Sequence, residues 1–194
     1  MTMTERRFSS PPADAGCAPR QGSRWLMLLV LVLTNVMGVI SPASAQDSPA
    51  ISVISEIPTF DSGEKSNWNF YDESPAKLVD GDTGTKYGLS SNNPWVEFHY
   101  ASPITPNGYI LWTANDELGK RNPRSWTIKG KNSGDADWTT IAEVDNSNGD
   151  KLPMADNTST TFYIRTPQSF QYYRFEATRA SNGEFQLAEL QFFE

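Results

Sequence analysis

The segment Lys77–Tyr87 contains the residue types that bind a hard metal ion. It reads Lys-Leu-Val-Asp-Gly-Asp-Thr-Gly-Thr-Lys-Tyr, so two carboxylates and a hydroxyl surround two glycines. Calcium binds about six to eight oxygen atoms from carboxylates and carbonyls, which Asp80, Asp82 and Thr85 would supply in a tight loop. The alternative is a Gly-rich turn whose Asp side chains bond to their own backbone. An EF-hand is excluded, because its sixth and twelfth positions require Gly and Glu.

A second set of candidates has the chemistry of a sugar-binding surface. Aromatic rings stack on the C–H face of a sugar, while Arg and Asn side chains bond to its hydroxyls. The aromatic candidates, in a polar stretch without a strand pattern, are Trp68, Phe70 and Tyr71. Such a cluster is either a binding tip or a flap over the core. The polar candidates are Asn115, Asp116 and Arg121, for which the alternative is an internal network that fixes their own loop.

Short β-rich runs separated by Gly, Pro, Asn, Asp and Ser must position these residues. Alternation is clearest where Val96, Phe98 and Tyr100 oppose the residues between them, which is the signature of a half-buried strand. Strands are predicted near Ile51–Ile57, Pro94–Tyr100, Gly108–Ala114, Ser125–Gly130, Trp138–Val144, Thr160–Arg165, Gln171–Thr178 and Gln186–Phe193. This spacing predicts an all-β sandwich or barrel. The tryptophans within strand patterns, predicted to be core residues, are Trp95, Trp112, Trp126 and Trp138.

Five ordered segments together resemble the discoidin, or coagulation factor V/VIII C-type, domain family. They are the Asp-Gly-Asp loop, Pro94–Tyr100, Ala114–Gly130 with Asp135–Trp138, Tyr172–Phe175, and Leu187–Phe192. The family includes bacterial galactose-binding-like carbohydrate-binding modules. The resemblance implies an eight-stranded jelly-roll β-sandwich over residues 51–194.

The resemblance also implies a calcium ion between the Asp-Gly-Asp loop and the last strand. The implied ligands are the Lys77 carbonyl, Asp80, Asp82, Thr85, the Ala188 carbonyl and Glu189. A calcium ion there would join segments that are distant in the sequence and stabilise the folded state by mass action. The family's ligand-contacting Arg falls near Arg121.

The N-terminus predicts export. Basic residues precede an apolar run from Trp25 to Ile40, and Ser-Pro-Ala-Ser-Ala follows, which is the pattern of a secretory signal peptide. We expect residues 1–45 to be removed near Ala45-Gln46, leaving 46–50 as a linker. A signal-anchor is the alternative, but the run is shorter than the roughly 20 apolar residues that a membrane span needs. The domain would then be secreted or periplasmic, with no membrane span in the mature chain.

Composition limits the partners and the chemistry. The mature chain retains 12 Lys and Arg against 21 Asp and Glu, a net charge of −9, which argues against nucleic acid and anionic lipid. Its one cysteine, Cys17, lies in the predicted signal peptide, so the mature domain is predicted to have no disulfide, zinc-thiolate site or cysteine nucleophile.

The sequence favours a binding function over catalysis. One histidine and no Gly-x-Ser-x-Gly elbow provide no nucleophile with its base. We therefore expect a monomeric, calcium-stabilised carbohydrate-binding module. Two alternatives stay open, a protein-binding adhesion or assembly module with a cell-envelope partner and, more remotely, a small glycoside hydrolase with a carboxylate pair.

Overall fold

The structure is a computed structural model that describes residues 50–68, 71–145, 151–179 and 182–194. The predicted signal peptide and Phe70 lie outside the described residues, as does the predicted linker except for Ala50.

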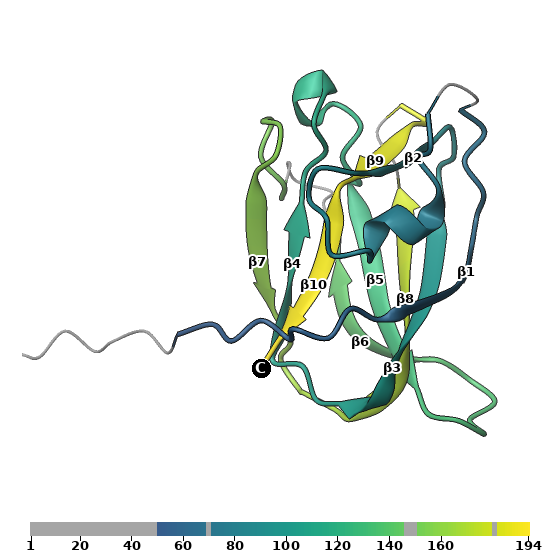
Figure 1. Ribbon diagram of the computed structural model, residues 1–194, viewed down its shortest axis with the longest axis vertical. Helices are drawn as coiled ribbons and strands as arrows, with labels where there is room; N and C mark the ends of the chain where they lie inside the picture. Colours follow the sequence, from purple (N-terminus) through teal and green to yellow (C-terminus); the bar gives the residue numbers. More distant parts are fainter. Residues whose placement is uncertain (1–49, 69–70, 146–150, 180–181) are drawn as a thin grey trace, which may run out of the picture. The chain divides into compact units, whose positions relative to one another are not determined.

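The described part of the chain contains ten strands and two short 3-10 helices (Figure 1). The strands are β1 (Thr59–Gly63), β2 (Tyr87–Leu89), β3 (Trp95–Ile104), β4 (Gly108–Trp112), β5 (Ser125–Lys131), β6 (Thr139–Val144), β7 (Ser159–Tyr163), β8 (Phe170–Arg179), β9 (Phe185–Leu187) and β10 (Glu189–Phe193). The 3-10 helices are η1 (Pro75–Leu78) and η2 (Glu117–Gly119). The predicted all-β class is confirmed, with ten strands in place of eight.

The count rises from eight to ten because β2 was not predicted and the predicted last strand is divided, while β1 takes the place of the predicted first strand. Ile51–Ile57 forms only one isolated bridge, between Val53 and Phe193, and the first strand is β1 instead. The apolar side chains of this segment find no continuous partner, and Ile57 is 61% exposed. The predicted last strand divides at Ala188 into β9 and β10, which lie in different sheets, and β2 pairs with β9.

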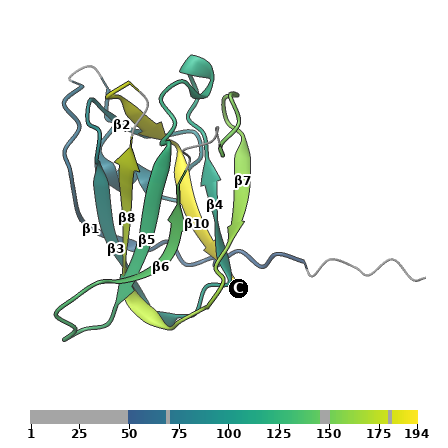
Figure 2. The same ribbon diagram turned by 180° about the vertical axis from the view of Figure 1, so that it is seen from behind.

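The strands build a β-sandwich. One sheet has the order β1-β3-β8-β5-β6 and the other the order β10-β4-β7, while β2 and β9 form a separate antiparallel pair. Figures 1 and 2 show the two larger sheets facing each other, with β2 and β9 at the end opposite the C-terminus. The predicted jelly-roll sandwich is confirmed in this arrangement.

Aromatic side chains fill the space between the sheets. Tyr173 of β8 contacts Phe192 of β10, with ring centroids 4.7 Å apart. The indole Nε1 of Trp126 on β5 donates a hydrogen bond of 3.0 Å to the hydroxyl of Tyr109 on β4. Because both groups are buried, this bond satisfies two polar atoms that would otherwise destabilise the core.

The prediction that four tryptophans belong to the core is correct only for Trp126, which is fully buried. The prediction is wrong for Trp95, Trp112 and Trp138, which are half-buried. On β3, Trp95 points to the same side as Glu97, opposite the buried residues between them, and the Arg174 guanidinium lies 4.3 Å from its ring centroid. Strand alternation therefore places Trp95 on the outer face of the five-stranded sheet.

Candidate functional site

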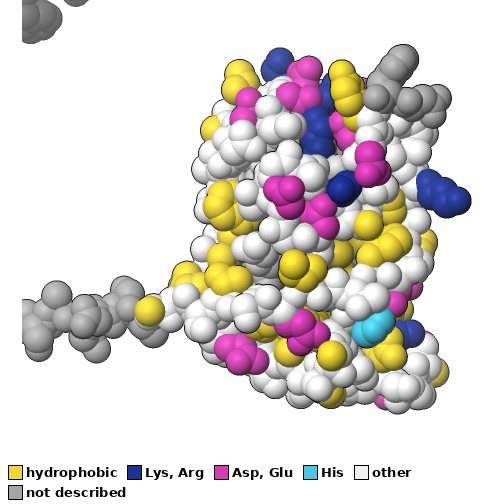
Figure 3. Space-filling model, in the orientation of Figure 1, with side chains coloured by type: hydrophobic (Ala, Val, Ile, Leu, Met, Phe, Trp, Pro, Cys, Tyr) yellow, Lys and Arg dark blue, Asp and Glu magenta, His cyan; other side chains and the backbone are white. Residues whose placement is uncertain are grey.

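The candidate site lies at the end of the sandwich that carries β2 and β9 (Figure 1). On the face shown in Figure 3, acidic and basic side chains are intermixed over this end of the domain, and hydrophobic side chains gather nearer the middle. The site has two adjoining parts, the Asp-Gly-Asp loop and an aromatic and charged cluster.

Hydrogen bonds close the Asp-Gly-Asp loop onto itself. The Thr85 hydroxyl donates to both carboxylate oxygens of Asp80, at 3.2 and 3.0 Å. The Asp82 carboxylate accepts a bond from the backbone N–H of Gly84 at 2.8 Å. Gly81 has a φ of +77°, a left-handed conformation that favours glycine. The glycines and aspartates thus form a tight turn.

The last strand meets this loop as the resemblance implies. Glu189 begins β10 directly after Ala188, and its Oε2 accepts a 2.9 Å hydrogen bond from the backbone N–H of Gly81. Lys77 lies just before the loop in η1, and its ammonium lies 3.4 Å from the Asp80 carboxylate. The structure therefore brings together Lys77, Asp80 and Glu189 from distant parts of the sequence.

Glu189 is an unusual acid. It is 1% exposed, and burial, followed by the nearby negative charge of Asp80, raises its pKa from 4.5 to about 8. Hydrogen bonds from the loop backbone act in the opposite direction. Burial and like charge both disfavour the ionised form of Glu189, whereas the Asp80 carboxylate has the Lys77 ammonium 3.4 Å away. Within the residues that the structure describes, no group of three or more His, Cys, Asp or Glu is arranged to hold a metal ion.

Trp68 lies as a flap over β2. Its indole N–H donates a 2.8 Å bond to the Ser90 hydroxyl, and a Cβ added to Gly88 would lie 2.6 Å from its ring. The guanidinium of Arg121 lies 4.9 Å from the ring centroid, within the range of a cation–π contact. Trp68 is therefore held by the protein itself, whereas Tyr71 is 78% exposed.

Arg121 is also fixed by acids. Its Nε donates a 2.8 Å hydrogen bond to Glu184, and its Nη2 lies 3.8 Å from Glu117. Its backbone carbonyl accepts a bond from the N–H of Gln186 on β9. With Trp68 against its guanidinium plane, Arg121 has its main partners within the fold.

Asp116 lies in an internal network, the alternative that the sequence left open, but with partners that the sequence did not predict. The Lys86 ammonium lies 2.7 Å from the Asp116 carboxylate and 3.4 Å from that of Glu73. Burial alone would raise the pKa of Asp116, but the hydrogen bond and charge of Lys86 outweigh it and lower that pKa. Lys86 and Glu73 are charged residues in polar runs, a pattern that usually indicates solvent exposure, so nothing in the sequence pointed to their burial.

Two buried oxygens in this network lack a hydrogen-bond partner within the described residues. They are Oε2 of Glu73 and Oε1 of Gln186. Gln186 pairs with Gly88 across β2 and β9, and a Cβ on Gly88 would lie 2.5 Å from Oε2 of Glu73. The Glu73 carboxylate therefore lies directly over this strand pair.

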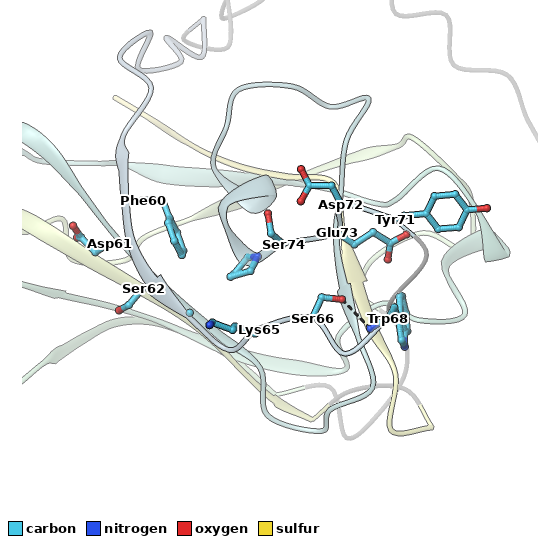
Figure 4. Close-up of a pocket in the computed structure, with 12 residues that line it drawn as sticks. Phe60, Asp61, Ser62, Lys65, Ser66, Trp68, Tyr71, Asp72, Glu73 and Ser74 are labelled. Atoms are coloured by element: carbon cyan, nitrogen blue, oxygen red, sulfur yellow. Dashed lines mark hydrogen bonds between the residues drawn. The ribbon is translucent and has the colours of Figure 1, made fainter.

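Two hollows adjoin the segment from Tyr71 to Glu73. One, of about 420 Å³, is also lined by Gly84–Lys86 and by Asn115 and Asp116. The other, of about 600 Å³, extends past Trp68 to Phe60; Figure 4 shows the Glu73 side chain between the rings of Trp68 and Tyr71. The first hollow brings three predicted ligand residues, Tyr71, Asn115 and Asp116, beside the Asp-Gly-Asp loop.

The family follows from a comparison with known domains. The sequence model of the F5/8 type C domain family matches residues 51–190. The chain belongs to this family. The discoidin resemblance of the sequence is thus confirmed, and the F5/8 type C domain covers all of the described strands except the last residues of β10. No curated protein matches the chain.

Solved structures show the same fold. The F5/8 type C domain of a Bacteroides fragilis protein has a TM-score of 0.62 and 15% identity, covering 76% of this chain and 98% of its own. The family 32 carbohydrate-binding module of Clostridium perfringens NanJ, in complex with galactose, has a TM-score of 0.57 and 14% identity, with 74% and 99% covered. A chitosan-binding module from a Paenibacillus chitosanase/glucanase has a TM-score of 0.51 and 17% identity, with 71% and 96% covered.

In the described part of this F5/8 type C domain, neither 3-10 helix is long or apolar enough to cross a membrane.

Proposed function

We propose that the chain is a secreted, non-catalytic carbohydrate-binding domain whose ligand lies in the hollow between Tyr71, Lys86 and Asp116. The single observation that supports this site is an exposed aromatic ring on the rim of a hollow that contains fixed charged groups. Tyr71 is 78% exposed, and Asn115 and Asp116 line the same hollow of about 420 Å³. An aromatic platform beside a few fixed polar groups is the usual design of a small-ligand site.

The roles of the predicted ligand residues differ in this proposal. Tyr71 stacks on the C–H face of a sugar ring, and Asn115 and Asp116 bond to its hydroxyls. Trp68 and Arg121 do not contact the sugar in this proposal but support the site, because their 4.9 Å contact with each other and the bond from Arg121 to Glu184 already engage them. Lys86 holds the Asp116 carboxylate at 2.7 Å and so fixes its direction.

The ligands of similar domains support a carbohydrate. Their structures include complexes with galactose and with GalNAc-β-1,3-galactose, and one of the modules binds chitosan. The membership in a family of such modules also supports binding without catalysis. Secretion rests on the predicted signal peptide, and the partner is then a glycan outside the cell.

We include a structural calcium ion in the proposal. The residues fit a hard cation: Asp80 and the buried Glu189 meet beside Gly81, and Thr85 adds a hydroxyl. Burial and then the negative charge of Asp80 raise the pKa of Glu189, and a divalent cation would relieve the repulsion between the two carboxylates. Asp82, whose carboxylate faces its own loop, and the carbonyls of Lys77 and Ala188 complete the proposed set. A bound calcium ion would neutralise the carboxylates and link the loop to β10.

A glycan array on the purified protein tests the binding site. We expect the protein to bind one class of glycan. Tyr71→Ala should weaken that binding by at least about fivefold in Kd, because a stacked ring contributes on the order of 1 kcal/mol or more. Tyr163→Ala is the matched control, since Tyr163 is 72% exposed on β7, away from the hollow. Equal loss in both variants, or no glycan bound by the unaltered protein, would contradict the proposal. Release of reducing ends from a bound glycan would instead support the hydrolase alternative.

Thermal melting with and without calcium tests the metal site. We expect calcium to raise the Tm after EDTA treatment and Asp80→Asn to remove most of that rise. Asp156→Asn is a control, because it removes one negative charge from a loop outside the proposed site. A Tm that does not respond to calcium or EDTA would exclude the calcium site and leave the glycan proposal intact.

A further inference from the structure

A third hollow lies on the outer face of the five-stranded sheet. It has a volume of about 330 Å³, and its floor is the strand face that includes Tyr172 and Glu97. Asp61 of β1 forms one wall, and the hairpin loop between β5 and β6, from Asn132 to Trp138, forms the other. We call it the sheet groove. Figure 2 shows this hairpin loop at the end of the domain opposite β2.

Two aromatic rings line the sheet groove outside the core. Trp138 is half-buried, and the ammonium of Lys131 lies 4.6 Å from its ring centroid. The Tyr172 ring lies 5.3 Å from that of His99 and lines the same hollow. The outer face of an antiparallel sheet is usually polar, so two accessible rings in one hollow provide apolar area for a ligand.

The carboxylates of the sheet groove differ in how many of their oxygens accept hydrogen bonds. Glu97 is fully engaged, accepting bonds of 2.8 Å from both Arg174 and Ser62. Asp61 uses one oxygen for His99 at 2.8 Å, and Asp135 uses one for the Asn132 N–H at 2.8 Å. The second oxygen of each aspartate accepts no hydrogen bond from the residues that the structure describes. Two acceptor-only groups therefore remain open beside the rings.

The charged side chains of the sheet groove decide which ligand with apolar faces and hydroxyls it would bind. No acid lies within ion-pair distance of Lys131 in the described part of the chain, and its ammonium rests on the Trp138 ring. This ammonium covers the Trp138 ring, so Tyr172 is the ring left for stacking. The two aspartates Asp61 and Asp135 outnumber the one lysine in the groove. A ligand with its own ammonium gains a charge-assisted hydrogen bond from the open oxygen of Asp135 and is attracted by Asp61. A sugar acid would be repelled by the same carboxylates.

We propose that the sheet groove is a second binding site, independent of the Tyr71 hollow, that takes a hexosamine residue with a free amino group. The sugar's C–H face packs on Tyr172 beside Trp138. Its ammonium is bound by Asp135, and Asp61 adds negative charge from the opposite wall. Because the two hollows lie on different parts of the domain, one chain can hold two glycan segments at once, which raises its avidity for a polymer without new contacts.

Calorimetric titration with matched oligosaccharides tests this site. The probes are a glucosamine tetramer and the N-acetylglucosamine tetramer, which have the same backbone and differ in the amine charge. We expect the glucosamine tetramer to bind at least about tenfold more tightly at low salt, and this advantage to fall as added salt screens the aspartates. Trp138→Ala and Asp135→Asn should each weaken that binding about fivefold or more.

Two control variants distinguish binding in the sheet groove from binding in the Tyr71 hollow and from general attraction to an acidic surface. Glu143→Gln removes the same charge from exposed β6 outside the groove, and Tyr71→Ala alters the two hollows beside Tyr71 but not the sheet groove. Both variants should change the glucosamine affinity less than about twofold. Equal affinity for the two tetramers, unchanged binding in Trp138→Ala, or loss of binding in Tyr71→Ala would each overturn the proposal. A lysine tetrapeptide that binds as tightly as the glucosamine tetramer would also overturn it, because the attraction would then be to cations alone.

Discussion

Lys86 gives the sharpest stability prediction, because it is a buried charge between two acids. Its side chain is 10% exposed and that of Glu73 is 8% exposed, while Asp116 remains 49% exposed. Replacing Lys86 by Met keeps the length of the side chain and removes the ammonium. Glu73 then lies buried without a counter-ion, and its Oε2 already lacks a partner among the described residues.

The expected loss of folding free energy in Lys86→Met follows from this burial. Breaking a buried ion pair by removing one partner costs about 3–5 kcal/mol, whereas an exposed pair is worth about 0–1 kcal/mol. Because the 3.4 Å contact to Glu73 is buried and the 2.7 Å contact to Asp116 is half exposed, we expect Lys86→Met to cost about 3 kcal/mol. The double variant Lys86→Met with Glu73→Gln should recover most of this loss, since it removes both buried charges.

Urea unfolding of the four proteins in this mutant cycle measures the effect. Glu73→Gln alone should cost less than Lys86→Met, because Lys86 retains Asp116 as its partner. A cost below about 1 kcal/mol for Lys86→Met, or a double variant no more stable than the single one, would refute the interpretation as a buried pair.

Two further predictions concern stability at other positions. Burial alone would raise the pKa of Glu176, but Lys129 at 2.7 Å and the neighbouring Arg174 lower it below 4.5. The resulting stabilisation is complete above pH 4.5 and is lost as the pH falls through the lowered pKa. In a pH series, the Tm of Glu176→Gln should therefore fall less on acidification than the Tm of the unaltered protein. An equal fall in Tm for both proteins would contradict this prediction. Gly88→Ala places a Cβ 2.6 Å from the Trp68 ring and 2.5 Å from the Glu73 carboxylate, so it should cost about 1–3 kcal/mol and alter tryptophan fluorescence. Unchanged stability and fluorescence would contradict this packing.

Local patterns were sufficient for most of the fold. Alternation along Trp95–Tyr100 indicated both the strand and its buried side, since burial of one face enforces a period of two. The same pattern already placed Trp95 on the outer face, and the preference of tryptophan for cores led to the opposite prediction. Ile51–Ile57 shows a β-rich composition, but a strand also needs a continuous partner, and this segment forms only the single bridge from Val53 to Phe193.

The candidate site was less predictable because it depends on contacts between distant segments. The Asp-Gly-Asp composition indicated a tight loop, and the family resemblance brought Glu189 to it, as the bond from Gly81 to Glu189 shows. No local signal indicated that Arg121 would cover Trp68 or that Lys86 would be buried between two acids. Such pairings are fixed by the way β2, β9 and the η2 loop pack, which the sequence of any one segment does not encode.

The most direct test of the central claim is an amide chemical-shift map of the protein titrated with the best neutral glycan from the array. The proposal predicts that the largest changes fall on Tyr71, Lys86, Asn115 and Asp116, with saturation at a single Kd and little change at Tyr163. Changes confined to another surface, or none at saturating glycan, would contradict the assignment of the Tyr71 hollow as the carbohydrate site.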